Sequence, residues 1–304
     1  VKEQAEQINK FKENKEYLPN VILPDGLIVT SVDEEAIVDS EFVVLAVPSK
    51  FVRQTMERFK EYMNEEQIIV NLSKGFEEES LYRLSEVIGE IFPNNKVCIL
   101  SGPSHAEEVS KALPTTCVAA CKDVEVAEKV QDIFINESFR VYTNVDIIGV
   151  EIGGSLKNVI ALAAGISDGL GYGDNSKAAL MTRGLTEISK LGIKMGANRN
   201  TFNGLTGIGD LIVTCTSMHS RNRRAGIMIG SGKSLEETLR EIHMVVEGVE
   251  NAKAAFALSK KYNVEMPITN EIYKVLFENK DPREAVYDLM TREKTSEHAM
   301  LITY

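Results

Sequence analysis

The first half of the chain alternates short, continuous apolar runs with amphipathic stretches. Continuous apolar runs are typical of strands buried on both faces, whereas apolar residues three and four positions apart indicate helices. Strands are predicted at 27–31, 42–48, 67–73, 96–102, 115–121 and 139–144. Their alternation with helices predicts an α/β fold with a parallel, doubly wound, Rossmann-like sheet.

From residue 145 the hydrophobic pattern becomes helical, and the short run 211–216 is the one further strand that we expect. We therefore predict two domains. A dinucleotide-binding domain covers 1–144, and an all-helical substrate and catalytic domain covers 145–304. The cleft between two such domains is the expected site.

A dinucleotide-binding sheet normally opens with a strand, the sequence G-x-G-x-x-G and a helix. This sequence starts instead at Val1 in a polar stretch with a helical pattern. Its glycine cluster at 204–210 does not follow a buried strand, so we expect a turn there. We expect the domain 1–144 to be truncated at its N-terminus, lacking its first strand, glycine loop and helix and hence the usual pyrophosphate site.

Composition and charge exclude several classes of function. A formal net charge of −11 over 304 residues argues against non-specific binding to nucleic acid. We expect no segment long enough to span a membrane, and the polar N-terminus is no secretory signal. The cysteines and histidines lack metal-binding spacing, so we expect no metal site and a reduced, cytoplasmic protein. These residues are Cys98, Cys117, Cys121, Cys215, His105, His219, His243 and His298.

Lys157 stands in a stretch, 151–167, that is otherwise composed mainly of small and apolar residues. In a helix its own face carries two glycines and two alanines, namely Gly153, Gly154, Ala161 and Ala164. One interpretation is close helix packing, with the ammonium extending to water. The other is a functional amine in a closed cleft, with room beside it for a substrate. The stretch by itself leaves both interpretations open.

Three of the predicted strands end in turns that contain serine, glycine or lysine. In an open parallel sheet, ligands bind beyond the carboxyl ends of the strands. Lys74 places a cation there, and Gly75 and Gly102 permit close approach of the backbone. Ordinary turns favour serine and glycine as well, so these turns alone do not identify a site.

A cluster of arginines lies at the start of a predicted helix. Ser220 is the expected N-cap, and Arg221, Arg223 and Arg224 follow in the first turn. Cations at this end oppose the helix dipole. An anion held by the helix start and a guanidinium would explain them, whereas the alternative is a solvated basic turn.

Seven segments in one order carry a family resemblance: LAVPS, SKGFE, LSGPSHAEEV, GVEIGGSLKNVIALAAGISDGL, GLTGIGDLIVTCTS, SRNRR and VVEG. Together they resemble the bacterial NAD(P)-dependent glycerol-3-phosphate dehydrogenase family, from about residue 17 to residue 269. The resemblance implies interconversion of sn-glycerol 3-phosphate and dihydroxyacetone phosphate with NAD or NADP. It also implies that the product supplies phospholipid synthesis.

The resemblance further implies roles for individual residues. Lys157 would accept the proton, with Asp210 beside it in the catalytic site. The implied substrate contacts are Lys74, Gly102, Ser104, Lys157, Asp210, Ser220, Arg221 and Asn222. The implied cofactor contacts are Lys74, Ala106, Arg221, Val245 and Glu247. Two positions depart from the family pattern: His105 stands where phenylalanine is usual, and Ser155 where alanine is commoner. We expect neither change to abolish activity.

These roles agree with elementary chemistry. Oxidation of a secondary alcohol needs a hydride acceptor and a base. Burial and a neighbouring Lys74 would lower the pKa of Lys157, and Asp210 would oppose that shift but could orient the amine. Arg221 and Asn222 would hold the substrate phosphate.

Two other functions remain open. One is a related β-hydroxyacid dehydrogenase, and the other is a non-catalytic binding protein with a degenerate cofactor domain. We expect a phosphorylated triose substrate and a homodimer, with neither nucleic acid nor membrane as a partner.

Overall fold

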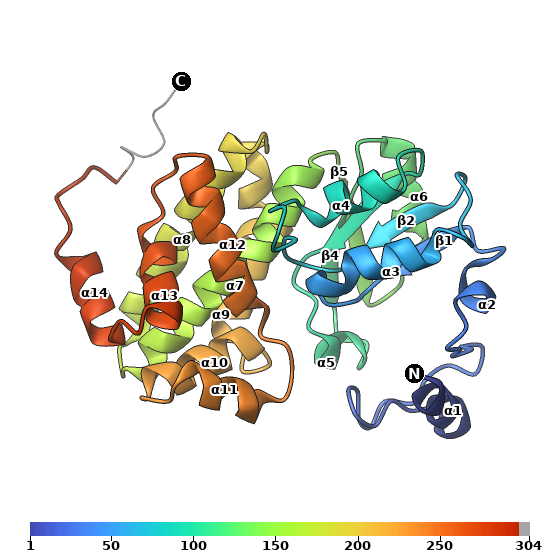
Figure 1. Cartoon of the computed structure of the whole chain (residues 1–304), viewed down its shortest axis with the longest axis horizontal. Coiled ribbons are helices and arrows are strands. Elements are labelled where there is room, and N and C mark those ends of the chain that lie inside the picture. Colours follow the sequence, from blue (N-terminus) through green and yellow to red (C-terminus); the bar gives the residue numbers. More distant parts are fainter. Residues whose placement is uncertain (298–304) are drawn as a thin grey trace.

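A five-stranded sheet forms the centre of the first half of the chain (Figure 1). The structure, a computed structural model, describes residues 1–297, so His298 lies outside the described part. The strands follow one another in chain order across the sheet: β1 (Phe42–Leu45), β2 (Ile68–Asn71), β3 (Val97–Ser101), β4 (Thr115–Ala120) and β5 (Phe139–Asn144). Five of the six strands predicted before residue 145 are therefore confirmed.

The expectation of an entirely parallel sheet is wrong at one pair of strands. β1, β2 and β3 are parallel, as are β4 and β5, but β4 runs antiparallel to β3. A parallel neighbour requires a crossover connection over one face of the sheet. The chain between β3 and β4 contains only the single helical turn α5 (Ala106–Val109), which reverses the chain at one end of the sheet.

The predicted strand at 27–31 is also wrong, because this segment is irregular. Ile28 is 83% exposed, and β1 is an edge strand with no partner on its outer side among the described residues. An apolar run forms a strand only where a neighbouring strand accepts its hydrogen bonds. Two short helices, α1 (Lys2–Phe11) and α2 (Asp33–Ile37), flank the segment.

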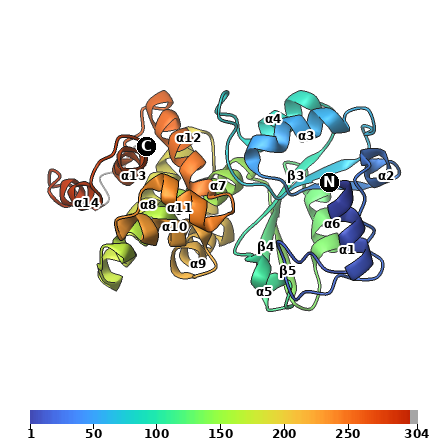
Figure 2. The same ribbon diagram turned by 60° about the horizontal axis from the view of Figure 1, so that its bottom comes forward.

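Helices cover both faces of the sheet (Figure 2). α3 (Val52–Phe59) and α4 (Leu84–Ile91) pack on one face, around a core that includes Ile69. α6 (Val124–Phe134) packs on the other face with Val70. Adjacent residues of β2 thus point to opposite faces and are both buried, which explains the continuous apolar run.

The second half of the chain is a helical lobe built around α7 (Ile147–Gly169) (Figure 1). The other helices are α8 (Asp174–Lys194), α9 (Asp210–Thr216), α10 (Arg221–Gly230), α11 (Leu235–Ile242), α12 (Glu247–Lys261), α13 (Pro267–Phe277) and α14 (Pro282–Met290). Two short turns, η2 (Arg199–Asn203) and η3 (Leu205–Gly209), precede α9. The Rossmann-like lobe followed by a helical lobe confirms the predicted fold class.

The short strand expected at 211–216 is wrong, because this segment forms most of α9. Leu211, Thr214 and Cys215 are buried, whereas Ile212 is 46% exposed. Burial at positions three and four apart is the helical period, which a six-residue apolar run does not reveal by composition. The glycine cluster before it forms a turn of π-helix at η3 rather than a reverse turn.

α7 corrects the expectation that no segment has membrane-spanning length. Its 23 residues are long and apolar enough to cross a bilayer, by length and composition. Within the fold, however, 94% of its most apolar 18-residue window is buried. It is the central core helix of the helical lobe.

α7 and α10 cross at very close range. Gly165 and Gly169 of α7 meet Gly226 and Gly230 of α10, and a Cβ atom at Gly226 would lie 2.2 Å from the carbonyl oxygen of Leu162. Only glycines allow this approach of two backbones. The crossing brings the start of α10, with its arginines, toward the middle of α7 and Lys157.

Candidate active site

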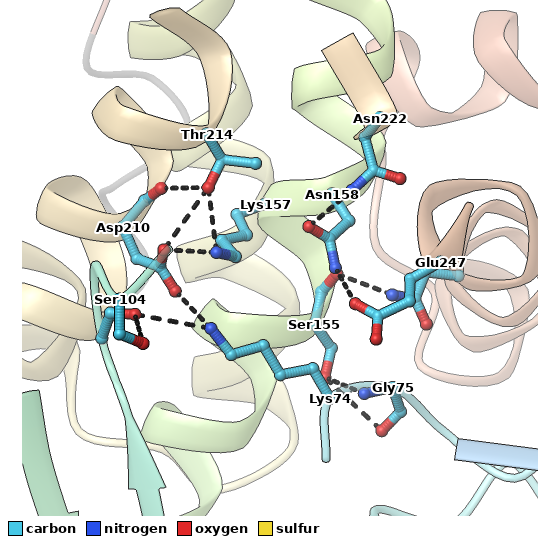
Figure 3. A network of polar contacts seen from close by, with 12 residues as sticks. Lys74, Gly75, Ser104, Ser155, Lys157, Asn158, Asp210, Thr214, Asn222 and Glu247 are labelled. Atoms are coloured by element: carbon cyan, nitrogen blue, oxygen red, sulfur yellow. Dashed lines mark hydrogen bonds and ion pairs between the residues drawn. The ribbon is translucent and has the colours of Figure 1, made fainter. Parts of the chain in front are cut away.

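Lys157 is buried in the middle of α7, with only 5% of its surface exposed. Its amine donates a hydrogen bond to the carboxylate of Asp210 and another, of 2.9 Å, to the hydroxyl of Thr214 (Figure 3). The interpretation in which the ammonium extends to water is therefore wrong. The amine is held inside the molecule by two groups of α9.

The expectation that the glycines beside Lys157 leave room for a substrate is wrong. A Cβ atom at Gly153 would lie 2.5 Å from the carbonyl oxygen of Thr206. At Gly154 it would lie 2.8 Å from the hydroxyl of Ser101 and within 3.8 Å of the aliphatic chain of Lys74. The space is filled by other parts of the protein, so the small residues serve close packing around the amine.

Asp210, the first residue of α9, lies between two lysines. Oδ1 accepts from Lys157, and Oδ2 accepts from Lys74 at 2.9 Å (Figure 3). Lys74 comes from the turn after β2, so the carboxylate joins the two lobes. The same lysine amine lies 3.5 Å from the carbonyl oxygen of Gly102. A single buried carboxylate thus neutralises one of two neighbouring ammonium groups.

This arrangement shifts the pKa of each group in an expected direction. Burial lowers the pKa of Lys157 to about 8, with the charge of Lys74 acting in the same direction and Asp210 opposing it. Burial alone would raise the pKa of Asp210, but the two ammonium groups hold it below its ordinary value. Burial disfavours the charged form of Lys74, yet Asp210 more than offsets this and raises its pKa. Lys157 is the group that can exchange a proton near neutral pH.

Thr214 is a site residue that the sequence analysis missed. Its hydroxyl accepts from Lys157 and donates to the backbone carbonyl of Asp210 at 2.6 Å. Asp210 and Thr214 are four positions apart and lie on one face of α9, which fixes both against the lysine. Predicting a strand at 211–216 concealed this spacing, because residues four apart do not form such a cluster in a strand.

A chain of amides connects three helices of the helical lobe beside Lys157. The side chain of Asn222 in α10 donates to Asn158 in α7 at 2.9 Å, and Asn158 donates to Glu247 in α12 at 3.0 Å (Figure 3). The backbone N–H of Gly248 donates to Asn222 at 2.8 Å. The side chain of Asn222 thus uses one of its two amide N–H groups within the protein, and the residue lines the cavity. No pattern in the sequence indicates this role of Asn158.

The arginine cluster divides in space. Ser220 caps α10 as predicted, since its hydroxyl accepts from the backbone N–H of Arg223 at 3.2 Å. The guanidinium of Arg223 pairs with Asp168 at 2.8 Å, and Arg224 is exposed outside the site. Arg221 lines the central cavity and has no ion-pair partner within residues 1–297. Among the described residues, Arg221 is thus the arginine of this cluster that both lines the cavity and lacks an ion-pair partner.

A cavity of about 650 Å³ brings most of the predicted residues together. Its lining includes Lys74, Ser104, Ala106, Lys157, Asp210, Ser220, Arg221, Asn222 and Glu247, from both lobes. Gly102 is outside the lining and contributes its carbonyl oxygen to Lys74. Val245 lines a neighbouring cavity of about 970 Å³, which also includes Arg221 and Glu247 in its wall.

The lining of the two cavities suits a nicotinamide nucleotide. Lys74 and Arg221 offer cations to phosphate, and Glu247 offers an acceptor to hydroxyl or amide groups. Ala106 and Val245 are at least partly exposed and have no polar side chain that would obstruct a flat ring. Within residues 1–297, no three or more His, Cys, Asp or Glu residues gather as a metal site would require.

Comparison with known proteins agrees with the family resemblance. The family profile described as the NAD-dependent glycerol-3-phosphate dehydrogenase N-terminus matches residues 1–127, and that of the C-terminus matches residues 146–287. Glycerol-3-phosphate dehydrogenase (NAD(P)+) of Thermoanaerobacter sp. strain X514 is 58% identical over 97% of this chain and 89% of its own length. The Fusobacterium nucleatum protein of that name is 55% identical, with the same coverage of both chains.

Solved structures agree as well. The crystal structure of glycerol-3-phosphate dehydrogenase from Coxiella burnetii superimposes with a TM-score of 0.92 at 35% identity, covering 95% of this chain and 89% of that one. The resemblance carried by the seven sequence segments is confirmed. The chain belongs to the NAD-dependent glycerol-3-phosphate dehydrogenase family.

Proposed function

We propose that this chain interconverts sn-glycerol 3-phosphate and dihydroxyacetone phosphate, with NAD or NADP as cofactor. The observation that carries the proposal is a buried lysine, Lys157, held on Asp210 in the same cavity as Arg221, an arginine without an ion-pair partner in the described part of the chain. The lysine supplies the base for an alcohol, and the arginine supplies the charge for a phosphate.

Lys157 acts in both directions of the reaction. With a pKa of about 8, a substantial fraction of the amine is neutral near physiological pH and can accept the hydroxyl proton of the substrate during oxidation. In reduction, the ammonium form returns that proton to the carbonyl oxygen. The bound nicotinamide supplies the complementary chemistry by accepting or giving the hydride.

Asp210 positions Lys157 and does not exchange the proton itself, because its own pKa is held low. Lys74 occupies the second oxygen of this carboxylate and lies at the reacting end of the cavity. There its charge stabilises the negative charge that develops on the substrate oxygen. Ser104 and the carbonyl of Gly102 complete this end of the site.

The phosphate of the substrate binds at the start of α10. The first backbone N–H groups of a helix have no partner within the helix and attract anions. Arg221 adds a guanidinium, and Ser220 fixes the first turn through its cap. Ala106, Val245 and Glu247, together with Lys74 and Arg221, contact the cofactor.

Two alternatives carry less support. A β-hydroxyacid dehydrogenase would need a site for a lone carboxylate, whereas Arg221 at a helix N-terminus suits a phosphate dianion. A non-catalytic binding protein would not need the Lys157–Asp210–Thr214 cluster at all. We therefore favour the dehydrogenase, which supplies glycerol 3-phosphate for phospholipid synthesis.

The protein acts in the cytoplasm as a homodimer, in our proposal. The four cysteines are free and buried, as in a reducing compartment. Exposed apolar residues on α14, Tyr287 at 67% and Met290 at 80%, offer surface for a second copy.

The test is a spectrophotometric assay of NADH and NADPH oxidation with dihydroxyacetone phosphate. A panel of β-ketoacids, and dihydroxyacetone without its phosphate, provides the comparison. We expect turnover with the phosphorylated triose and little with the other compounds. Preferential turnover of a β-ketoacid would favour the first alternative, and binding of the nucleotide without turnover of any substrate would favour the second.

A further inference from the structure

The turn that carries Lys74 rests on α7 two residues before Lys157. Gly154 accommodates the aliphatic chain of Lys74, whose Cδ would lie 3.8 Å from a Cβ atom there. Ser155 lies next to it and is 1% exposed. The turn belongs to the sheet lobe and α7 to the helical lobe, so this contact joins the two (Figure 3).

Ser155 binds the backbone of this turn through its hydroxyl. The N–H of Gly75 donates to Ser155 Oγ at 2.8 Å, and Oγ lies 3.4 Å from the carbonyl oxygen of Gly75, to which it donates. Asn251 of α12 donates to the backbone carbonyl of Ser155 at 2.9 Å. An alanine at position 155 would leave the buried N–H of Gly75 without this partner.

Gly75 brings the turn close to Ser49 on the other side. Its φ of +132° is a conformation that glycine adopts readily, and a Cβ atom would lie 2.9 Å from Ser49. Ser73 ties the turn to the sheet lobe through Val47, and the hydroxyl of Ser155 ties it to α7. Lys74 precedes Gly75 directly, so its backbone is fixed by the same hydrogen bond.

We infer that Ser155 is a positioning residue, which holds the turn 73–75 so that the amine of Lys74 stays on Asp210. This inference rests on the proposed role of Lys157 as the proton acceptor. It adds a residue that acts through Lys74 and touches neither substrate nor cofactor. By holding this turn, Ser155 keeps both Lys74 and Lys157 hydrogen-bonded to the carboxylate of Asp210.

Displacement of Lys74 from Asp210 would affect the pKa of Lys157 in two ways that act in the same direction. Lys157 would keep the carboxylate of Asp210 to itself and lose a neighbouring positive charge. Both changes favour its ammonium form and raise its pKa above the present value of about 8. The titratable and charged groups that interact with Lys157 are Asp210, Lys74, His105, Cys117 and Cys215.

The experiment compares Ser155→Ala with Ser167→Ala, a serine of α7 that is equally buried, at 3% exposure, and lies outside the site. The value of kcat/KM for glycerol 3-phosphate oxidation is measured between about pH 6 and pH 10. We expect the loss in Ser155→Ala to be roughly three- to tenfold larger at about pH 7 than at the alkaline end, where the remaining loss reflects the displaced charge of Lys74. Ser167→Ala follows the unsubstituted protein throughout.

A loss in Ser155→Ala that is equal at every pH would overturn the inference, because a structural defect has no such pH dependence. An unchanged profile would overturn it as well. Thermal denaturation of both variants shows whether the fold is retained.

A second measurement does not require activity. Trace acetylation of lysines with acetic anhydride at several pH values, read by mass spectrometry, gives the pKa of Lys157 directly. We expect a higher value in Ser155→Ala than in Ser167→Ala, and equal values would contradict the inference. If the unsubstituted protein has no dehydrogenase activity, the proposed function fails, whereas the labelling still decides whether Ser155 controls the charge around Lys157.

Discussion

The amine of Lys157 and the carboxylate of Asp210 form a buried ion pair between residues 53 positions apart in sequence. Lys157 lies in α7 and Asp210 in α9. The other carboxylate oxygen of Asp210 accepts a hydrogen bond from Lys74, which is 136 positions away in sequence. Burial disfavours the charged form of Lys157 and lowers its pKa, whereas the carboxylate of Asp210 favours the charged form and holds the amine in position. The pair therefore holds an amine that is fixed in position yet able to lose its proton.

This pKa sets the pH dependence of the two directions with opposite sign. Oxidation needs the neutral amine, so its rate should rise with pH and level off above about 8. Reduction needs the ammonium, so its rate should fall above the same pH. Initial rates in both directions, at saturating cofactor, test this. Profiles that change in the same sense in both directions would exclude Lys157 as the titrating group.

Asp210→Asn should lower the pH at which the rate of glycerol 3-phosphate oxidation rises. The substitution removes the negative charge that raises the pKa of Lys157 and leaves burial and Lys74 acting alone. We expect a shift of about one pH unit, with a loss of activity in reduction because the ammonium form becomes scarce. The pH profile of kcat/KM measures it. A shift to higher pH would show that the electrostatic assignment is wrong.

Arg221→Ala should weaken binding of the phosphorylated substrate. The guanidinium lines the cavity without an ion-pair partner in the described residues, so its removal leaves no unpaired carboxylate behind. We expect KM for dihydroxyacetone phosphate to rise by roughly ten- to a hundredfold, as for loss of a charge-assisted hydrogen bond. KM for the cofactor should rise less.

Arg224→Ala is the matched control for this prediction, because Arg224 lies in the same turn of α10 but is exposed outside the cavity. Its KM should stay near that of the unsubstituted protein. Equal effects of the two substitutions would indicate a general electrostatic attraction instead of a phosphate site.

Gly226→Ala should destabilise the helical lobe. A Cβ atom there would lie 2.2 Å from the carbonyl oxygen of Leu162, so α7 and α10 must separate. We expect the free energy of unfolding to fall by roughly 2–3 kcal/mol, measured by chemical denaturation. Gly173→Ala meets no atom within 4 Å and should cost less than about 1 kcal/mol. Similar losses for both would show that the close crossing contributes little to stability.

Much of the fold could be predicted from the sequence because local pattern and burial agree there. The segment 139–144 alternates in a way that suits a strand and has the predicted bounds, and 235–242 has a strongly amphipathic helical period and forms α11. Buried central strands such as β2 are apolar on both faces, so their runs are continuous. The antiparallel direction of β4 follows from the connection before it, which the strand's own residues do not encode.

The errors arise where the meaning of a residue depends on distant neighbours. Within residues 1–297 the apolar run 27–31 has no strand to pair with, and 211–216 has a helical period that is too short to recognise. Gly153 and Gly154 were correctly identified as neighbours of Lys157, but only the folded chain shows that Thr206 and Lys74 fill the space beside them.

The sequence indicated which residues belong to the candidate site better than it indicated the contacts between them. The family segments placed nine residues that line one cavity, although the sequence could not show that Arg223 pairs with Asp168 and leaves Arg221 alone. Thr214 and Asn158 were missed because the role of each comes from a contact with another helix. Thr214 contacts Lys157 of α7, and Asn158 contacts Asn222 of α10.

The turnover of Lys157→Ala with dihydroxyacetone phosphate and NADH tests the central claim most directly. The substitution should retain the fold, because Lys74 still pairs with Asp210, and should lower kcat by about a thousandfold. Small primary amines added to the assay should restore part of the rate in proportion to their concentration. A kcat near that of the unsubstituted protein, without added amine, would contradict the account.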